Sequence, residues 1–138
     1  MTTIKEVMTR DVHLMRPDQS IREAAELMAR TDVGSLPVSD DDRLIGMLTD
    51  RDLALRAVAR GLGPETAVRD VMTADIKYCH DHEDVAHVAR NMAELGIRRL
   101  PVVNAEKRLV GIVALSNIAQ SGNAQASESL LDGVAQPH

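Results

Sequence analysis

Apolar residues recur at the spacing of one helical face in two stretches of the chain. Ser20 and Glu23 have the spacing of a capping box at the start of the first stretch. Asp84 takes the capping position before the second stretch, and Gly96 follows it, where a helix can end in a left-handed residue. The pattern therefore predicts two equivalent amphipathic helices. Their apolar faces comprise Ile21, Ala24, Ala25, Leu27 and Met28 in the first and Val85, Val88, Ala89, Met92 and Leu95 in the second.

Each predicted helix is followed by two runs of apolar and β-branched residues that a polar turn separates, which predicts one β-hairpin in each half. The first turn, Asp40–Asp42, invites a metal site. Consecutive aspartates do not converge on one ion, however, so a solvated turn is favoured. A closing helix from Asp50 to Arg60 follows the hairpin. The predicted strands cover residues 35–39 and 44–49 in the first half and residues 99–103 and 109–114 in the second.

The two halves repeat one structural unit, and equivalent residues such as Val7 and Val71 lie 64 positions apart. Each copy reads α-β-α-β-β-α. A duplicated unit generally closes about a pseudo-two-fold axis, with two related ligand sites in the shared cleft. The short linker Gly61–Pro64 predicts one integrated module. The predicted parts are residues 1–62, residues 63–121 and a tail of residues 122–138 that is flexible or forms a short helix.

Composition restricts the partners of this chain. Its 138 residues are 44% hydrophobic, enough to fill a core, and they carry a formal net charge of −5. The chain has no basic stripe, and its sole aromatic residue is one Tyr, so we do not expect nucleic acid as a partner. No run of about 18 apolar residues and no targeting signal is present, so we expect no membrane segment and a cytoplasmic location. The single cysteine, Cys79, fits a reducing compartment.

Several blocks match a known family in the same order in both copies: VMT at residues 7–9 and 71–73, and LPV at residues 36–38 and 100–102. The first copy adds TDRD at residues 49–52. Over residues 4–121 the chain resembles a CBS domain pair, or Bateman module, and especially the small stand-alone CBS-pair proteins of actinobacteria.

The resemblance implies an α+β (α/β) fold of two pseudo-two-fold-related β-α-β-β-α repeats with small sheets packed together. It also implies a disc-shaped homodimer. Many members bind an adenosine-containing ligand such as AMP, ADP, ATP or S-adenosylmethionine between the repeats. An adenine nucleotide is therefore the expected regulatory ligand, and no required cofactor is expected.

The ligand motif of the family is a Ser or Thr followed three residues later by an Asp at a helix start, which Thr49 and Asp52 match. A hydroxyl beside free helix amides faces an anion, and one carboxylate can accept from both hydroxyls of a ribose. The same spacing is also an ordinary helix cap, and both interpretations stay open. The ligand-binding residues that the resemblance suggests are Thr49, Asp50, Arg51, Asp52, Gly34, Ser35, Pro37, Arg98, Arg99 and Asn117.

The second copy departs from this motif, with Ala114 and Asn117 at the two positions. Alanine removes the hydroxyl, and asparagine offers one uncharged acceptor oxygen, so we expect one competent adenosine site per chain. Arg98 and Arg99 begin a strand of the second copy. Their guanidinium donors suit phosphate oxygens; a surface or intersubunit ion pair is the alternative.

A short segment around Cys79, His80 and His82 is a weak candidate for a zinc or nickel site, with His87 nearby. Neighbours on an extended segment point in opposite directions, so two of these side chains at most reach one ion. Polar loop residues are therefore favoured over a metal site. In that interpretation His87 stabilises the helix start by contacting Asp84.

The sequence does not predict an enzyme, because no nucleophile is paired with a base and no glycine-rich phosphate loop occurs. Asp52 could serve as a general base, but nothing distinguishes that role from binding ribose. We expect a homodimeric ligand sensor that acts on an unidentified protein target. The alternative is a dimeric interaction scaffold without a nucleotide ligand, or a metal-stabilised stress-response protein.

Overall fold

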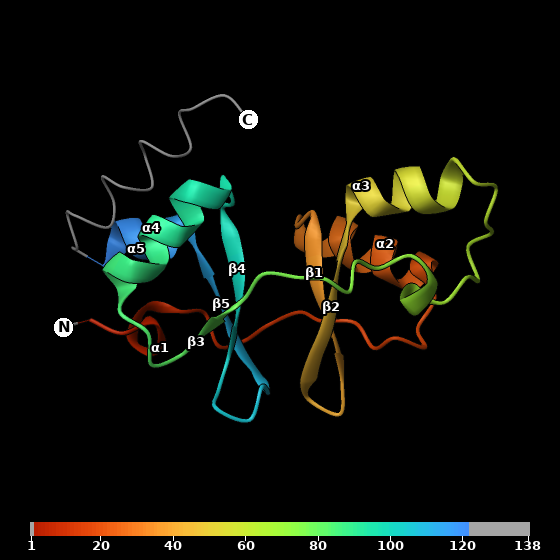
Figure 1. Ribbon diagram of the computed structural model, residues 1–138. Helices are drawn as coiled ribbons and strands as arrows, with labels where there is room; N and C mark the ends of the chain where they lie inside the picture. Colours follow the sequence, from red (N-terminus) through yellow and green to blue (C-terminus); the bar gives the residue numbers. More distant parts are fainter. Residues whose placement is uncertain (1, 122–138) are drawn as a thin grey trace. The chain divides into compact units, whose positions relative to one another are not determined.

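The computed structural model describes residues 2–121, which fall into two compact units (Figure 1). Unit 2 consists of His13–Ile76, and unit 1 consists of the described parts of Met1–Val12 and Lys77–His138. The predicted tail lies outside the described residues. No helix within residues 2–121 has the length and apolar character needed to cross a membrane.

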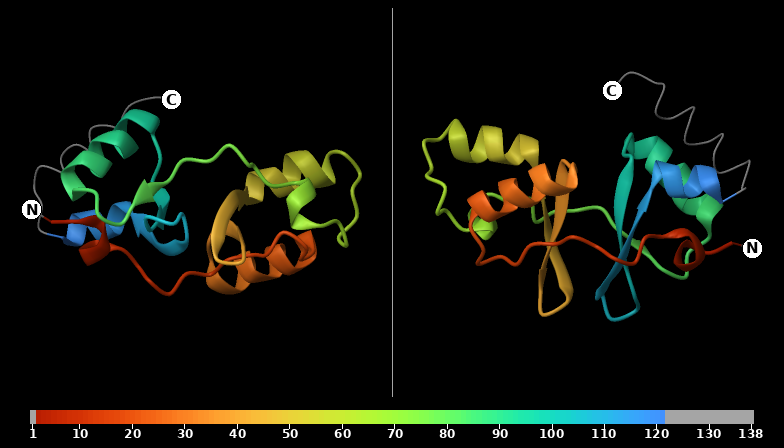
Figure 2. Two further views of the ribbon diagram at one scale, coloured as in Figure 1. Left: turned by 60° about the horizontal axis from the view of Figure 1, so that its bottom comes forward. Right: turned by 180° about the vertical axis from the view of Figure 1, so that it is seen from behind.

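Unit 2 contains a two-stranded antiparallel hairpin with helices on one face (Figures 1 and 2). Asp41 and Asp42 both have positive φ, 51° and 66°, so the acidic cluster forms the predicted tight turn. A core of Met15, Ile21, Ala24, Met28, Leu36, Val38, Leu48, Ala57, Val68 and Val71 fills the unit. Its elements are α2 (Ile21–Thr31), β1 (Ser35–Asp40), β2 (Arg43–Thr49), α3 (Asp50–Asp52), η1 (Leu53–Val58) and η2 (Val68–Asp70).

Unit 1 repeats this plan with a three-stranded sheet in the order β3-β4-β5. The first strand pairs in parallel with β4, and its counterpart in unit 2 is reduced to a single bridge between Met15 and Val38. The prediction of a first strand in both copies is therefore right for the second copy alone. The elements are α1 (Ile4–Val7), β3 (Cys79–His80), α4 (Val85–Leu95), β4 (Arg99–Val103), β5 (Leu109–Ala114) and α5 (Leu115–Gln120).

The closing helix of the first copy differs from the prediction of one helix over residues 50–60. Its first turn, α3, continues as the π-helix η1, in which Ala59 donates its amide to the carbonyl of Ala54. The corresponding helix of the second copy, α5, is α-helical. Gly61, with φ 73°, lies after the helix, as expected for a glycine that ends it.

The packing units do not follow the two sequence copies, because the first residues of each copy pair with the hairpin of the other copy. Thr9 exchanges two backbone hydrogen bonds with Ile112 of β5, at 2.8 and 2.9 Å. Thr73 does the same with Met47 of β2, at 2.8 and 2.9 Å. We call residues 4–9 the first lead segment and residues 68–73 the second. By packing, the chain therefore divides between residues 12 and 13 and between residues 76 and 77, whereas the linker Gly61–Pro64 was predicted as the division between the two sequence copies.

The predicted capping box of α2 is present. Glu23 donates its amide to Ser20 Oγ at 3.1 Å, and Ser20 donates its amide to Glu23 Oε2 at 3.0 Å. Asp84 occupies the cap position of α4, but its side chain makes no capping hydrogen bond, which corrects the prediction of equivalent caps. Gly96 ends α4 in the left-handed conformation as predicted, with φ 67°.

We expect Ser20→Ala to lower the free energy of unfolding by about 1 kcal/mol, because the amide of Glu23 loses its acceptor. Urea unfolding followed by circular dichroism measures the change. Asp84→Ala is the matched control, since it removes a residue at the same position of α4 that makes no capping bond. An equal loss in both variants would contradict the assignment of a working cap to Ser20.

Candidate functional site

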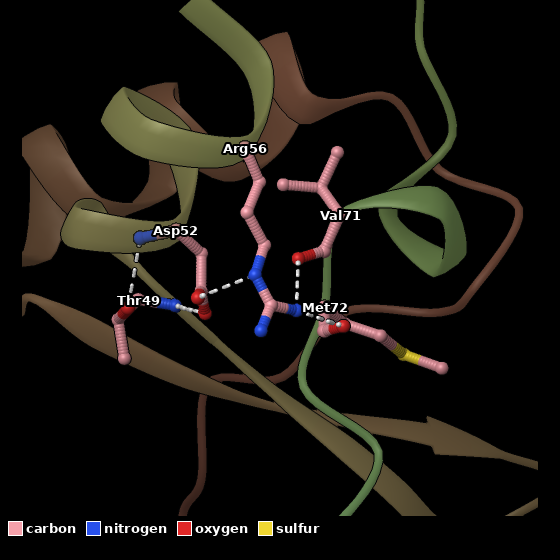
Figure 3. Close-up of polar contacts among 5 residues, drawn as sticks. All are labelled: Thr49, Asp52, Arg56, Val71 and Met72. Carbon is pink, nitrogen blue, oxygen red and sulfur yellow. Dashed lines mark hydrogen bonds and ion pairs between the residues drawn. The ribbon is translucent and has the colours of Figure 1, made fainter. Parts of the chain in front are cut away.

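The motif residues Thr49 and Asp52 close a reciprocal hydrogen-bonded pair at the junction of β2 and α3 (Figure 3). Thr49 Oγ1 accepts from the amide of Asp52 at 3.0 Å, and the amide of Thr49 donates to Asp52 Oδ2 at 3.0 Å. The Asp52 side chain is 14% exposed. The sequence-based alternative of a helix cap is therefore realised, and it fixes the carboxylate in place. A carboxylate has about four acceptor positions, so capacity remains for a ligand hydroxyl.

Other predicted site residues of the first copy surround this pair. Ser35 lies opposite Thr49 in the hairpin register, and Asp50 donates its amide to the carbonyl of Gly34 at 2.9 Å. A Cβ on Gly34 would lie 2.9 Å from Asp50 Oδ2, which is the end of an exposed side chain that can turn away. Arg51 is exposed at the start of α3. Pro37 is buried within β1 opposite Met47, two positions along the hairpin from the pair of Ser35 and Thr49.

Arg56 is a site residue that the sequence interpretation missed. Its Nε lies 3.8 Å from Asp52 Oδ1, and its Nη1 donates to the carbonyls of Met72 and Val71 at 3.1 and 3.5 Å (Figure 3). The available signal was the spacing of Asp52 and Arg56, since residues four apart on a helix are neighbours. The contact with residues 71 and 72 had no local signal.

The second copy holds Asn117 where Asp52 stands in the first. Asn117 Oδ1 accepts from the amide of Ala114 at 2.8 Å, and its Nδ2 donates to Thr9 Oγ1 at 3.4 Å. Both ends of the carboxamide are therefore engaged within unit 1. This leaves less acceptor capacity than a carboxylate offers.

Arg98 and Arg99 belong to unit 1, whereas the motif residues Thr49 and Asp52 belong to unit 2. Arg99 begins β4 opposite Ala114, and the carbonyl of Arg98 accepts from the amide of Leu115 at 2.9 Å. Both side chains are exposed. Within residues 2–121 neither guanidinium has a hydrogen-bond or ion-pair partner, so the predicted surface ion pair is not formed there.

The segment around Cys79 gives no metal centre in the part of the chain that the structure describes, where no three His, Cys, Asp or Glu side chains gather to hold an ion. Cys79 is buried in β3, and this desolvation, followed by the charges of Glu83 and Asp81, raises the pKa of its thiol to about 12. Protonated thiols are poor metal ligands.

The histidines of this segment gather around Glu83 instead. Its carboxylate accepts from the amide of His80 at 2.6 Å and lies 3.9 Å from His80 Nδ1 and 3.6 Å from His87 Nε2. The prediction that His87 contacts Asp84 is therefore wrong. Glu83, the residue before the cap position of α4, takes the place of Asp84 as the carboxylate beside His87. His82 lies 4.0 Å from Asp81.

The CBS domain family matches the chain twice, at residues 4–58 and at residues 68–122. This chain belongs to the CBS domain family, as a tandem pair, and its mixed α+β architecture agrees with that of solved CBS pairs.

Among its relatives, CBS domain-containing protein YhcV of Bacillus subtilis is 41% identical, covering 94% of each chain. Hypoxic response protein 1 of Mycobacterium tuberculosis is 36% identical over 99% of this chain and 96% of its own. This agrees with the resemblance to small stand-alone CBS pairs. A homoserine O-acetyltransferase of Methanosarcina acetivorans is also similar, but this chain covers 21% of that enzyme.

The solved structures similar to the chain include three whose bound ions or ligands are known. Hypoxic Response Protein I with two coordinated zinc ions has a TM-score of 0.78 and 37% identity, covering 87% of this chain and 98% of its own. CBSX2 in complex with AMP has a TM-score of 0.76 and 30% identity, covering 88% and 96%. The CBS domain pair of MJ0100 with 5-methylthioadenosine and S-adenosyl-L-methionine has a TM-score of 0.72 and 30% identity, covering 87% and 94%.

Proposed function

We propose that this CBS pair is a regulatory module that binds an adenosine-containing ligand at Thr49 and Asp52. The observation that carries the proposal is the Asp52 carboxylate, which is mostly shielded, fixed by the amide of Thr49, and has acceptor positions left over. A ribose diol can donate to such a group. Relatives solved with AMP and with S-adenosylmethionine support the ligand class.

The two copies are proposed to be unequal. Asn117 accepts from Ala114 through its oxygen and donates to Thr9 through its nitrogen. Asp52 accepts one hydrogen bond, from Thr49, and its other oxygen lies 3.8 Å from Arg56 Nε. We therefore assign the competent ribose site to the first copy. In unit 1, Arg98 and Arg99, whose guanidinium groups have no partner among residues 2–121, are the proposed contacts for a phosphate.

Ligand binding is proposed to act through a cytoplasmic homodimer on a separate protein target. An apolar hollow of about 320 Å³ in unit 2 favours association. The same hollow favours the alternative function, a dimeric interaction scaffold without a nucleotide. It is lined by Ile21, Arg22, Ala25, Leu53, Val58, Leu62 and Pro64.

We expect AMP, ADP, ATP, NADH or S-adenosylmethionine to raise the melting temperature selectively, because a ligand bound by the folded state alone stabilises it. Asp52→Asn should weaken that ligand about tenfold. The amide keeps the cap on Thr49 but offers ribose a neutral acceptor in place of a charged one. Differential scanning fluorimetry gives the shift, and isothermal titration calorimetry gives the dissociation constant.

Asn117→Ala is the control, because it removes the second-copy counterpart and should leave the affinity unchanged. A rise that Asn117→Ala abolishes and Asp52→Asn does not would move the ribose site to the second copy. If none of the five compounds changed the melting temperature, the scaffold alternative would replace the nucleotide sensor.

A further inference from the structure

We propose that Arg56 is a positioning residue that ties the ligand-reading carboxylate of Asp52 to the second lead segment, so that ligand binding changes how firmly that segment is held. This inference rests on the proposed function, since it takes Asp52 as the group that receives ribose. It adds a route by which the site reaches other parts of the chain.

The bridge is defined by one side chain with two kinds of partner. Nε of Arg56 lies 3.8 Å from Asp52 Oδ1, and Nη1 donates to the carbonyl of Met72 at 3.1 Å and, more weakly, to that of Val71 at 3.5 Å. A planar guanidinium has five donors in a fixed fork, so it can hold a carboxylate and a carbonyl at once. Figure 3 shows Arg56 between Asp52 and the two carbonyls.

The two oxygens of Asp52 have different tasks. Oδ2 receives the amide of Thr49, whereas Oδ1 is the oxygen that faces Arg56. A ribose hydroxyl that donates to Oδ1 withdraws part of its negative charge from Arg56. Ligand occupancy and the hydrogen bonds of Arg56 to the two carbonyls are therefore coupled, and the coupling is reciprocal.

The segment held by Arg56 is the second lead segment, which packs in unit 2 although its residues open the second copy. Its ends are fixed by hydrogen bonds from Val68 to the carbonyl of Gln19 at 2.7 Å and from Thr73 to that of Met47 at 2.8 Å. After Thr73 the chain continues to Lys77, where unit 1 resumes. A change at residues 71 and 72 thus acts on the connection to the other unit.

The second copy makes the equivalent link without such a bridge. Asn117 Nδ2 reaches Thr9 of the first lead segment directly, and the counterpart of Arg56 is Ser121, whose hydroxyl donates to the carbonyl of Ile118 at 2.6 Å. The arginine bridge accompanies the copy that retains Thr49 and Asp52. That copy also carries the π-helix η1, which begins directly after Asp52, and π turns often occur at functional sites.

The test is hydrogen exchange at the amides of residues 71–73, measured by NMR with and without AMP and, in a parallel series, S-adenosylmethionine. In the wild type we expect saturating ligand to change exchange at these amides. Arg56→Met should tighten the ligand about threefold to tenfold, because Oδ1 no longer shares its negative charge with a guanidinium, and it should abolish the exchange change even at saturation. Arg60→Met is the control, because Arg60 is an exposed arginine beyond η1 whose side chain makes no polar contact within residues 2–121.

Arg56→Lys separates charge from bridging, and it carries the test if Arg56→Met does not fold. One ammonium keeps a positive charge beside Asp52 but lacks the fork, so the affinity should return to the wild-type value and the exchange change should stay absent. A ligand-dependent exchange change that persists in Arg56→Met, or in Arg56→Lys where Met does not fold, would overturn the inference while leaving the proposed function intact. If no ligand changed either the melting temperature or the exchange of the wild type, the inference and the proposed function would both be overturned.

Discussion

Cys79 should react with thiol reagents about a thousandfold more slowly in the folded protein than an unburied thiol does. The side chain is 4% exposed in β3, and burial, followed by the charges of Glu83 and Asp81, raises its pKa from 9.0 to about 12. The thiolate is the reactive form, and three pH units correspond to about a thousandfold less of it below pH 9. Limited access to the sulfur slows the reaction further.

Because the chain has a single cysteine, one reagent reads this position without mutation. The time course of Ellman's reagent at pH 8, with and without denaturing urea, measures the ratio of the two rates. Labelling of the native protein at the rate of the urea-unfolded chain would show that β3 leaves its thiol open. Glutathione at the same pH supplies the reference rate for an unburied thiol.

The sequence predicted the parts of the fold that local chemistry determines. The aspartates after β1 form the tight turn, Ser20 caps α2, and Gly96 ends α4 with positive φ. Each of these features depends on residues within a few positions of one another. The duplication was equally readable, because two strings at a fixed offset need no knowledge of packing.

The exchange of lead segments could not be predicted in this way. Val7 and Val71 are equivalent in sequence, and either could pack on its own copy or on the other. The choice depends on hydrogen bonds between residues far apart in the chain, Thr9 with Ile112 and Thr73 with Met47. Periodicity within one copy contains no information about such pairs.

The candidate site shows the same limit. Thr49 and Asp52 were found from their spacing, and the spacing also predicted the cap that the structure contains. Arg56 was missed because its partners at residues 71 and 72 belong to the other copy. The contact of His87 with Glu83 and not with Asp84 had no sequence signal either, because residues three and four positions apart can both be neighbours at a helix start.

The exchanged lead segments lie so close to the hairpins that glycine is required beneath them, and Gly111→Ala should therefore lower the free energy of unfolding by about 1–3 kcal/mol. A Cβ at Gly111 would lie 2.6 Å from Met8 Sδ and 2.8 Å from the carbonyl oxygen of Thr9. The sulfur can move, but that oxygen accepts the amide of Ile112 at 2.9 Å. Relief of the clash therefore costs the pairing of the lead segment with β5.

The equivalent change in unit 2, Gly46→Ala, should cost less. There the added carbon would lie 3.0 Å from the carbonyl oxygen of Thr73 and 2.7 Å from the flexible Met72 sulfur. Gly63→Ala is the control, with no heavy atom within 4 Å of the added carbon and an expected change within about 0.5 kcal/mol. Urea unfolding measures all three. Equal stabilities of Gly111→Ala and Gly63→Ala would show that the first lead segment does not press on β5.

Labelling of Cys79 then distinguishes local from global loss of structure, because Gly111 and Cys79 share unit 1 and Gly46 belongs to unit 2. If the units open separately, Gly111→Ala accelerates labelling and Gly46→Ala does not. If they open together, each variant accelerates labelling in proportion to its own loss of stability.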